Sequence, residues 1–152
     1  MSLHLAPGPT ALDRLETAIG RLQQKHGFTR VGAGQTDFPA GLCALLLTED
    51  PQRNPEVLDA CVILPEALKP LGDTITCWVA GPDASPALQQ QFGVGRPPAV
   101  IFLNEGAYLG SLNGLRDWRD YQIEIAHLLS GPPRPKPIGI AVRAIDAQGA
   151  CA

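Results

Sequence analysis

The stretch that most constrains the fold of this chain is residues 85–114, which read SPALQQQFGVGRPPAVIFLNEGAYLGSLNG. It opens with the signals of a helix, because Ser85 is a good N-cap, Pro86 suits the first helical position and Gly93 can end the helix in the left-handed conformation. A pair of prolines that ends at Pro98 then excludes helix and holds the chain in extended or turn geometry. We therefore expect a short helix followed by an abrupt change of structure.

Two strands are predicted after the proline pair. Residues 99–103 form the unbroken apolar run AVIFL, as expected for a strand that is buried on both faces. Asn104, Glu105 and Gly106 supply the chemistry of a tight turn, and residues 107–112 alternate well enough to form a returning strand. The segment therefore predicts an antiparallel hairpin.

This order of elements resembles the C-terminal half of the thioredoxin fold, provided that an amphipathic helix follows. In that family the proline before the strand is cis and faces the redox site, and Pro98 stands at its position here. The alternative is a generic β-hairpin between two helices. The spacing of residues 92–94, Pro98 and Gly106 matches the thioredoxin family and favours the first interpretation.

The rest of the chain supplies the other elements of such a fold. Apolar periodicity and capping residues predict a helix from Thr10 or Asp13 to His26, helices over residues 55–68 and 115–129, and strands over residues 28–31, 42–47 and 74–80. The side chains expected to be buried on the last helix are Trp118, Tyr121, Ile125 and Leu128. Right-handed crossovers would place the central strands in one mixed sheet. The predicted fold is α/β and thioredoxin-like, with about four to five strands flanked by helices.

A chain of 152 residues is long enough for one domain with a substantial core. We expect a flexible N-terminus at residues 1–10, the thioredoxin-like domain at residues 11–130 and a proline-rich tail at residues 131–152. A mobile tail is the favoured interpretation of that last segment. The alternative is that its alternating residues, Ile138, Ile140 and Val142, add a strand to a sheet edge or to a second subunit, as in a homodimer.

Charge and hydropathy limit the partners and the location. The N-terminus lacks the basic and apolar regions of a signal peptide, and no apolar run approaches the roughly 20 residues of a membrane span. We therefore expect a cytoplasmic protein without stable membrane insertion. Residues 1–130 hold 9 Lys and Arg against 14 Asp and Glu. This acidic balance argues against nucleic acid as a partner and favours a basic one.

The cysteines and histidines do not form a motif. The four cysteines are Cys43, Cys61, Cys77 and Cys151, without any C-x-x-C, and the three histidines are His4, His26 and His127. Cysteines at such spacing in a cytoplasmic protein are most often small core hydrophobes. No pair has the spacing of zinc ligands, so neither a structural metal nor a cofactor is expected.

The redox apparatus of thioredoxins is missing. In that family a W-C-x-x-C motif begins the helix after the central strand, where the helix dipole and partial exposure lower the pKa of the attacking thiol. Counting back from Pro65, which matches the proline in that helix, the two cysteine positions fall at Val57 and Ala60. Cys61 is adjacent but turned roughly 100° towards the apolar face. We expect no thiol–disulfide chemistry and no enzyme. The alternative is a redox protein that uses Cys61 or Cys43 as a single thiol.

The segment that stands in place of the redox motif is residues 49–59, EDPQRNPEVLD. Together with F-G-V-x-R-x-P-A and Y-x-G-x-L-N-G, it resembles the hydrogenase expression/formation proteins of the HupG/HyaE type. The matching residues are Asp50, Pro51, Arg53, Pro55, Glu56, Asp59, Phe92, Gly93, Val94, Arg96, Pro98, Ala99, Tyr108, Gly110, Leu112, Asn113 and Gly114. The resemblance covers about residues 12–130.

This resemblance implies a cytoplasmic accessory factor, or chaperone, for the maturation of a membrane-bound [NiFe] uptake hydrogenase. The factor would bind the small-subunit precursor at its twin-arginine (Tat) signal peptide and hold it from export until assembly is complete.

The acidic segment suggests how such a peptide could bind. The predicted partner-binding residues are Glu49, Asp50, Arg53, Glu56, Asp59, Arg96 and Pro98. Carboxylates accept bidentate hydrogen bonds from the guanidinium groups of a twin-arginine signal. The alternative for Glu56 and Asp59 is that they complement the helix dipole without any ligand. For Arg96, the favoured interpretation is an internal ion pair with one of these carboxylates.

Pro97 limits the analogy with peptide binding by thioredoxins. In that family the residue before the cis proline pairs its backbone with an extended peptide, but Pro97 has no N–H to donate. We therefore expect the peptide to bind through charge and an apolar groove more than through backbone pairing.

Overall fold

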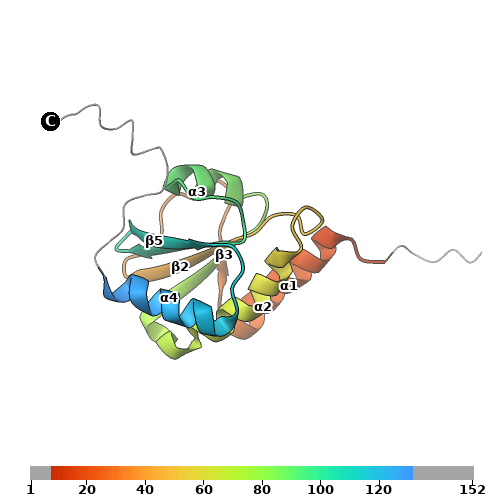
Figure 1. The fold of residues 1–152 in the computed structure, drawn as a ribbon. Coiled ribbons are helices and arrows are strands. Elements are labelled where there is room, and N and C mark those ends of the chain that lie inside the picture. The colour runs from red at the N-terminus through yellow and green to blue at the C-terminus, as the bar shows by residue number, and fades with distance from the viewer. Residues whose placement is uncertain (1–7, 132–152) are drawn as a thin grey trace, which may run out of the picture.

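The computed structural model describes residues 8–131, and within them four helices cover the two faces of a five-stranded sheet (Figure 1). In chain order the elements are α1 (Ala11–His26), β1 (Thr29–Arg30), β2 (Leu42–Leu47), α2 (Glu56–Leu68), the 3-10 helix η1 (Lys69–Thr74), β3 (Ile75–Ala80), α3 (Ser85–Phe92), β4 (Ala99–Asn104), β5 (Ala107–Asn113) and α4 (Trp118–Ser130). None of the helices in this part of the chain is both long and apolar enough to cross a bilayer. The tail predicted at residues 131–152, apart from Gly131, and residues 1–7 of the predicted N-terminal segment lie outside the described residues.

The sheet is mixed, with the strand order β1-β3-β2-β4-β5. β1, β3 and β2 are parallel, whereas β4 is antiparallel to both β2 and β5. The predicted mixed sheet is therefore confirmed, and the short strand expected near residues 28–31 is the edge strand β1. The predicted hairpin is also confirmed, and its turn places Glu105 at φ 54° and Gly106 at φ 79°.

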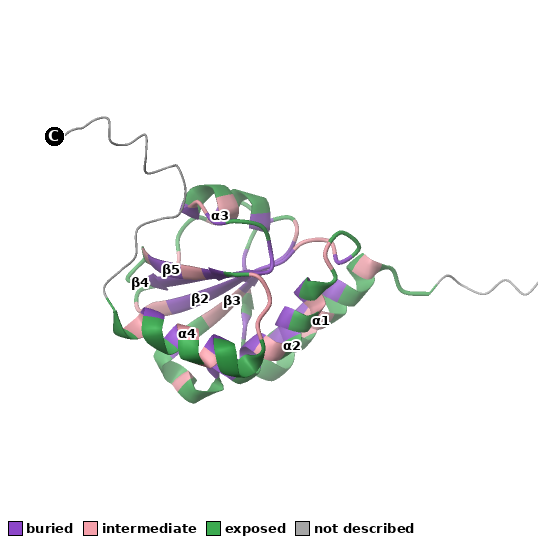
Figure 2. Cartoon of the chain, viewed as in Figure 1, coloured by how far each residue is buried: buried purple, intermediate pink, exposed green. Residues whose placement is uncertain are grey.

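The strand β2 lies at the centre of the sheet. This position explains why its sequence is apolar without interruption. Ala44 and Leu46 face the layer formed by α1, α2 and α4, while Cys43, Leu45 and Leu47 face the layer that contains α3. Figure 2 shows the buried residues concentrated along the strands between these two layers. Because both faces are covered by helices, a strand with a polar face would leave polar groups buried without partners.

Two helix starts differ from the sequence-based expectation. Ser85 is not the N-cap of α3 but its first helical residue, and its side chain is buried. The Ser85 hydroxyl accepts a hydrogen bond from the Thr48 N–H at 3.0 Å and donates one to the Ala80 carbonyl at 3.1 Å. It therefore joins the ends of β2 and β3 to α3, a tertiary role that local capping rules do not anticipate.

The predicted burial of Trp118 is wrong, since this side chain is 50% exposed. The helix α4 begins at Trp118 rather than near residue 115, because Asp117 caps it by accepting a hydrogen bond from the Asp120 N–H. Trp118 consequently occupies the first turn at the rim of the domain. The other three side chains predicted on this face are buried: Tyr121, Ile125 and Leu128.

Candidate functional site

The candidate site is formed where two connections meet at one end of the central strands β2 and β4. β2 and β4 are antiparallel neighbours, with Leu47 opposite Ala99. The connection that leaves β2 therefore lies beside the one that enters β4. The first carries residues 49–59, and the second carries Arg96 and Pro98.

Arg96 and Glu49 form the internal ion pair that was the favoured interpretation of Arg96. The Arg96 Nε donates to Glu49 Oε2 at 2.8 Å, although the two residues are 47 positions apart. The Glu49 side chain is 18% exposed and that of Arg96 is 59% exposed. An ion pair this open to water contributes at most about 1 kcal/mol to stability. Its main consequence is that the charge of Glu49 is already neutralised within the protein.

Asn54 connects the two loops. Its Oδ1 accepts a hydrogen bond from the Glu56 N–H at 3.2 Å, immediately before α2, whose N-cap is Pro55. Its Nδ2 donates to the Pro97 carbonyl at 2.7 Å, a contact across 43 positions of the chain. An amide side chain carries both an acceptor and a donor. The Nδ2 donor of Asn54 was therefore the sequence signal for a second partner.

The bond between Pro97 and Pro98 is cis, as in thioredoxins, and both prolines are buried. The Pro98 carbonyl accepts a hydrogen bond from the Gly114 N–H at 2.9 Å. Because the Pro98 ring is buried, it can shape the site but offers little contact surface. The Pro97 carbonyl already accepts one hydrogen bond from Asn54, and Pro97 has no N–H to donate to an added strand.

Asp50 stabilises the loop in which it lies through local hydrogen bonds. Its Oδ1 accepts a hydrogen bond from the Gln52 N–H at 2.9 Å, which forms an Asx turn. Its carbonyl accepts from the backbone N–H of Arg53 at 2.9 Å and of Asn54 at 3.2 Å. The Arg53 side chain is exposed, and it forms neither a hydrogen bond nor an ion pair within the described part of the chain.

Glu56 and Asp59 are the two acidic site residues that remain open. Both lie in the first turn of α2 and both are exposed. Residues three apart lie on the same face of a helix, so the two carboxylates are neighbours. Neither forms an ion pair with another residue between positions 8 and 131. Of the acidic residues predicted to bind a partner, these two alone combine exposure with an unengaged carboxylate in the described chain.

Comparison of the sequence with known proteins identifies the family. Residues 18–121 match the family model described as Hydrogenase-1 expression protein HyaE. The chain belongs to the HyaE family. Its relatives include a hydrogenase expression/formation protein HoxO of Cupriavidus necator, which is 35% identical over 99% of this chain and 96% of that protein. Another is a hydrogenase expression/formation protein HupG of Bradyrhizobium diazoefficiens, which is 34% identical over 78% of this chain and 84% of that protein.

The fold of this HyaE-family protein is thioredoxin-like. A solved structure described as the J-Trx1 fragment of ERdj5 superposes with a TM-score of 0.56 at 12% identity, over 72% of this chain and 53% of that one. At this identity the similarity concerns the fold alone. The expected resemblance to hydrogenase expression/formation proteins of thioredoxin-like fold is therefore confirmed. An accessory family of this kind suggests a role that is not catalytic.

In this HyaE-family protein the positions of the two thioredoxin cysteines hold no thiol. Val57 and Ala60 are both fully buried. Cys61, the adjacent residue, is 5% exposed, and burial raises its pKa to about 12. A thiol with so high a pKa is almost entirely protonated at neutral pH and is a poor nucleophile. The geometry thus disfavours the alternative in which Cys61 acts as a single redox thiol.

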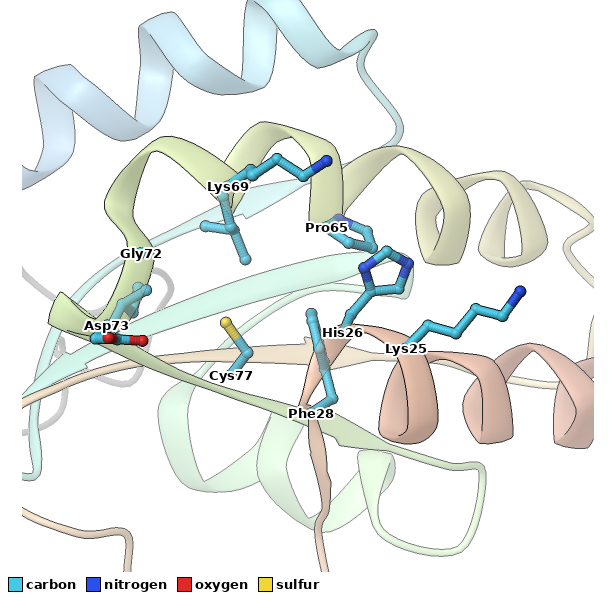
Figure 3. Close-up of a pocket in the computed structure, with 10 residues that line it drawn as sticks. Lys25, His26, Phe28, Pro65, Lys69, Gly72, Asp73 and Cys77 are labelled. Atoms are coloured by element: carbon cyan, nitrogen blue, oxygen red, sulfur yellow. The ribbon is translucent and has the colours of Figure 1, made fainter.

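A second thiol, Cys77, lies in a cavity of about 290 Å³ between the ends of α1, α2 and β3 (Figure 3). Burial, and to a smaller extent the neighbouring Cys43, raises the pKa of Cys77 to about 11. Lys69 at the rim is paired with Glu66 at 3.2 Å. The cavity adjoins the second half of α2, away from the acidic loop. No group of three potential metal ligands is found in the part of the chain that the structure describes.

We expect Cys43, Cys61 and Cys77 to react very slowly with a thiol reagent at pH 7.5 in the folded protein. For Cys77, with a pKa near 11, roughly one thiol in a few thousand is ionised at that pH, and the fraction is smaller still for Cys61. Cys43 is protected because its side chain is completely buried. The measurement is the rate of disulfide exchange with an aromatic disulfide in a Cys151→Ser variant, which removes the thiol outside the described residues. All three thiols should react within minutes after unfolding in guanidinium. Rapid reaction of one thiol before unfolding would favour the single-cysteine redox alternative.

Proposed function

We propose that this HyaE-family protein is a non-redox, chaperone-like factor that binds the twin-arginine signal peptide of a hydrogenase small-subunit precursor in the cytoplasm. The observation that carries the proposal is the pair of exposed carboxylates, Glu56 and Asp59, at the start of α2. Membership of a hydrogenase expression family supports a hydrogenase-related partner. Paired guanidinium groups are the chemical complement of paired carboxylates.

The dipole of α2 does not prevent this interaction. A helix N-terminus carries roughly +0.5 of an elementary charge, which on its own would repel arginine. Glu56 and Asp59 together carry two negative charges, which outweigh the half charge of the dipole and the single positive charge of the nearby Arg53. The dipole and the ligand are therefore compatible reasons for acidic residues at this position.

The remaining predicted partner-binding residues have supporting roles in this proposal. Glu49 and Arg96 neutralise one another and hold the two loops together, while Asp50 and the buried Pro98 fix the loop shape. Arg53 is exposed beside the acidic pair and is proposed to contact the peptide. Since Pro97 has no N–H to donate and its carbonyl already accepts from Asn54, the peptide binds by charge and apolar contact more than as an added strand.

The decisive experiment is titration calorimetry with the synthetic signal peptide of the cognate hydrogenase small subunit. We expect binding that weakens with salt and weakens about tenfold when both arginines of the peptide become lysine, because lysine cannot form the bidentate contact. A Glu56→Gln/Asp59→Asn variant should show a similar loss. Asp37→Asn provides a control, since Asp37 is exposed in the connection that leads into β2. Absence of binding to the unaltered peptide would refute the signal peptide as the ligand.

A further inference from the structure

An apolar groove runs between α2 and α4 on the helical layer of the molecule. Its volume is about 260 Å³, and its apolar lining includes Ala67, Leu71, Ile125, Ala126 and Leu129. Gln122 lines both this groove and a second hollow that Trp118 and Glu66 also line, so the two adjoin at that side chain. α2 packs against α4, and the two helices lie on the same face of the sheet in Figure 1.

The acidic pair and this groove lie on one face of α2. Glu56, Asp59, Ile63 and Ala67 follow one another at spacings of three and four residues, which places them on a single helical stripe. The stripe begins with the two exposed carboxylates, passes the half-buried Ile63 and reaches Ala67, which lines the groove. A ligand that follows the stripe would therefore meet negative charge first and apolar surface second.

Charge distinguishes this groove from the one on the other side of α2. The groove between α1 and α2 is lined by two basic residues, Arg21 and His26, and by Glu66, whose carboxylate is paired with Lys69 at 3.2 Å. The lining of the α2–α4 groove contains no basic side chain, so this groove does not repel a peptide that carries two arginines. The indole of Trp118 borders the adjoining hollow, is 50% exposed and adds apolar contact area there, although the Arg119 guanidinium lies over its ring at 6.0 Å from the centroid.

We infer that the α2–α4 groove holds the apolar segment that follows the arginine pair of the signal peptide, bound as a short helix. This inference rests on the proposed function, in which the arginines bind Glu56 and Asp59. The apolar region of such a peptide has about 7–15 residues, which span roughly 10–22 Å as a helix. The part of α2 that follows Asp59, residues 60–68, spans about 14 Å at the same rise. This length lies within the range of the apolar segment.

The test compares two variants of α4 in the full chain by titration calorimetry. Ala126 is exposed and lines the groove, so Ala126→Glu places a charge where the apolar segment would pack. Ile123 is exposed on the same helix and does not line the groove, so Ile123→Glu makes the same change of charge outside it. We expect Ala126→Glu to weaken binding of the complete peptide about tenfold and Ile123→Glu to leave it nearly unchanged.

A second peptide separates this inference from the proposed function. It keeps the arginine pair but has serine in place of the apolar residues, and it should bind the wild type and Ala126→Glu equally. If the wild type binds the complete peptide and Ala126→Glu binds it just as tightly, the groove inference is wrong while the proposed function stands. If the wild type binds neither peptide, both are wrong.

The Ala126 methyl signal in an NMR titration reports which molecule occupies the groove. It should shift when the complete peptide is added and stay constant on dilution of the protein. A shift on dilution alone would assign the groove to a second copy of the chain. If the Ala126 signal shifts when Ile138 and Ile140 are changed to serine but does not respond to the peptide, the groove is occupied by residues 132–152. Either of these results would overturn the inference.

Discussion

Changing both Glu56 and Asp59 to lysine is expected to lower the affinity for the twin-arginine peptide by at least about a hundredfold. A hydrogen bond to a charged group contributes about 1.5–3 kcal/mol, and each 1.4 kcal/mol is a factor of about ten in affinity. The variant loses two such contacts and also repels the arginines. Titration calorimetry at low and moderate salt measures the loss, which should be largest at low salt.

The matched control is the double change Asp37→Lys/Asp73→Lys. Both aspartates are exposed, and neither side chain forms a hydrogen bond or ion pair within residues 8–131, so net charge changes equally without touching α2. Each lysine in the first turn of α2 should cost about 0.3–1 kcal/mol through the helix dipole, so thermal denaturation must show that the variant is folded. A peptide with glutamate in place of both arginines should bind the Glu56→Lys/Asp59→Lys variant and not the wild type. Equal loss of affinity in the control would mean that net charge, not the acidic pair, governs binding.

Replacing Tyr121 by alanine is expected to lower the free energy of unfolding by about 3–5 kcal/mol, the usual range when a large aromatic side chain is removed from a core. Tyr121 is completely buried and is the largest fully buried side chain of the described chain. For a domain of this size the corresponding fall in melting temperature is about 10–20 °C. Denaturant unfolding followed by circular dichroism measures the change in free energy.

The Tyr121→Phe variant distinguishes the contribution of the ring to stability from that of its hydroxyl group. The hydroxyl donates to the Gly114 carbonyl at 3.3 Å, and the Gly114 N–H in turn donates to the Pro98 carbonyl at 2.9 Å. Because the hydroxyl contact is long, its loss should cost no more than about 1 kcal/mol. A phenylalanine variant as unstable as the alanine variant would mean that the hydrogen bond, and not the packing of the ring, anchors α4.

The fold was largely predictable because its strongest signals are local or periodic. The apolar runs of β2 and β4 could only be strands buried on both faces, and the glycine turn at Gly106 could only reverse the chain. Thr10 caps α1 in a capping box with Asp13, which decides between the two helix starts that the sequence left open. The start of α4 was misplaced because several residues before Trp118 could have begun a helix, and the cap formed by Asp117 decided among them.

The location of the candidate site was also predictable, but the roles of its residues were not. A polar segment that follows a central strand lies at the C-terminal end of that strand. The sequence was therefore enough to place residues 49–59 there. The sequence presents Glu49 and Glu56 as equivalent acids of the same segment. In the structure Glu49 is largely buried and neutralised by Arg96, which is distant in the chain, whereas Glu56 is exposed and unpaired within the described residues.

The sequence alone determined the order of the elements, the absence of the thioredoxin cysteines and the acidic character of residues 49–59, since each of these is written in adjacent or periodically spaced residues. Only the tertiary structure decided which carboxylates stay open, that Asn54 joins the two loops, and that the acidic pair leads into the groove between α2 and α4. The physical reason is that these features depend on contacts between segments far apart in the chain. Such contacts are fixed by strand register and helix packing, which no local pattern specifies.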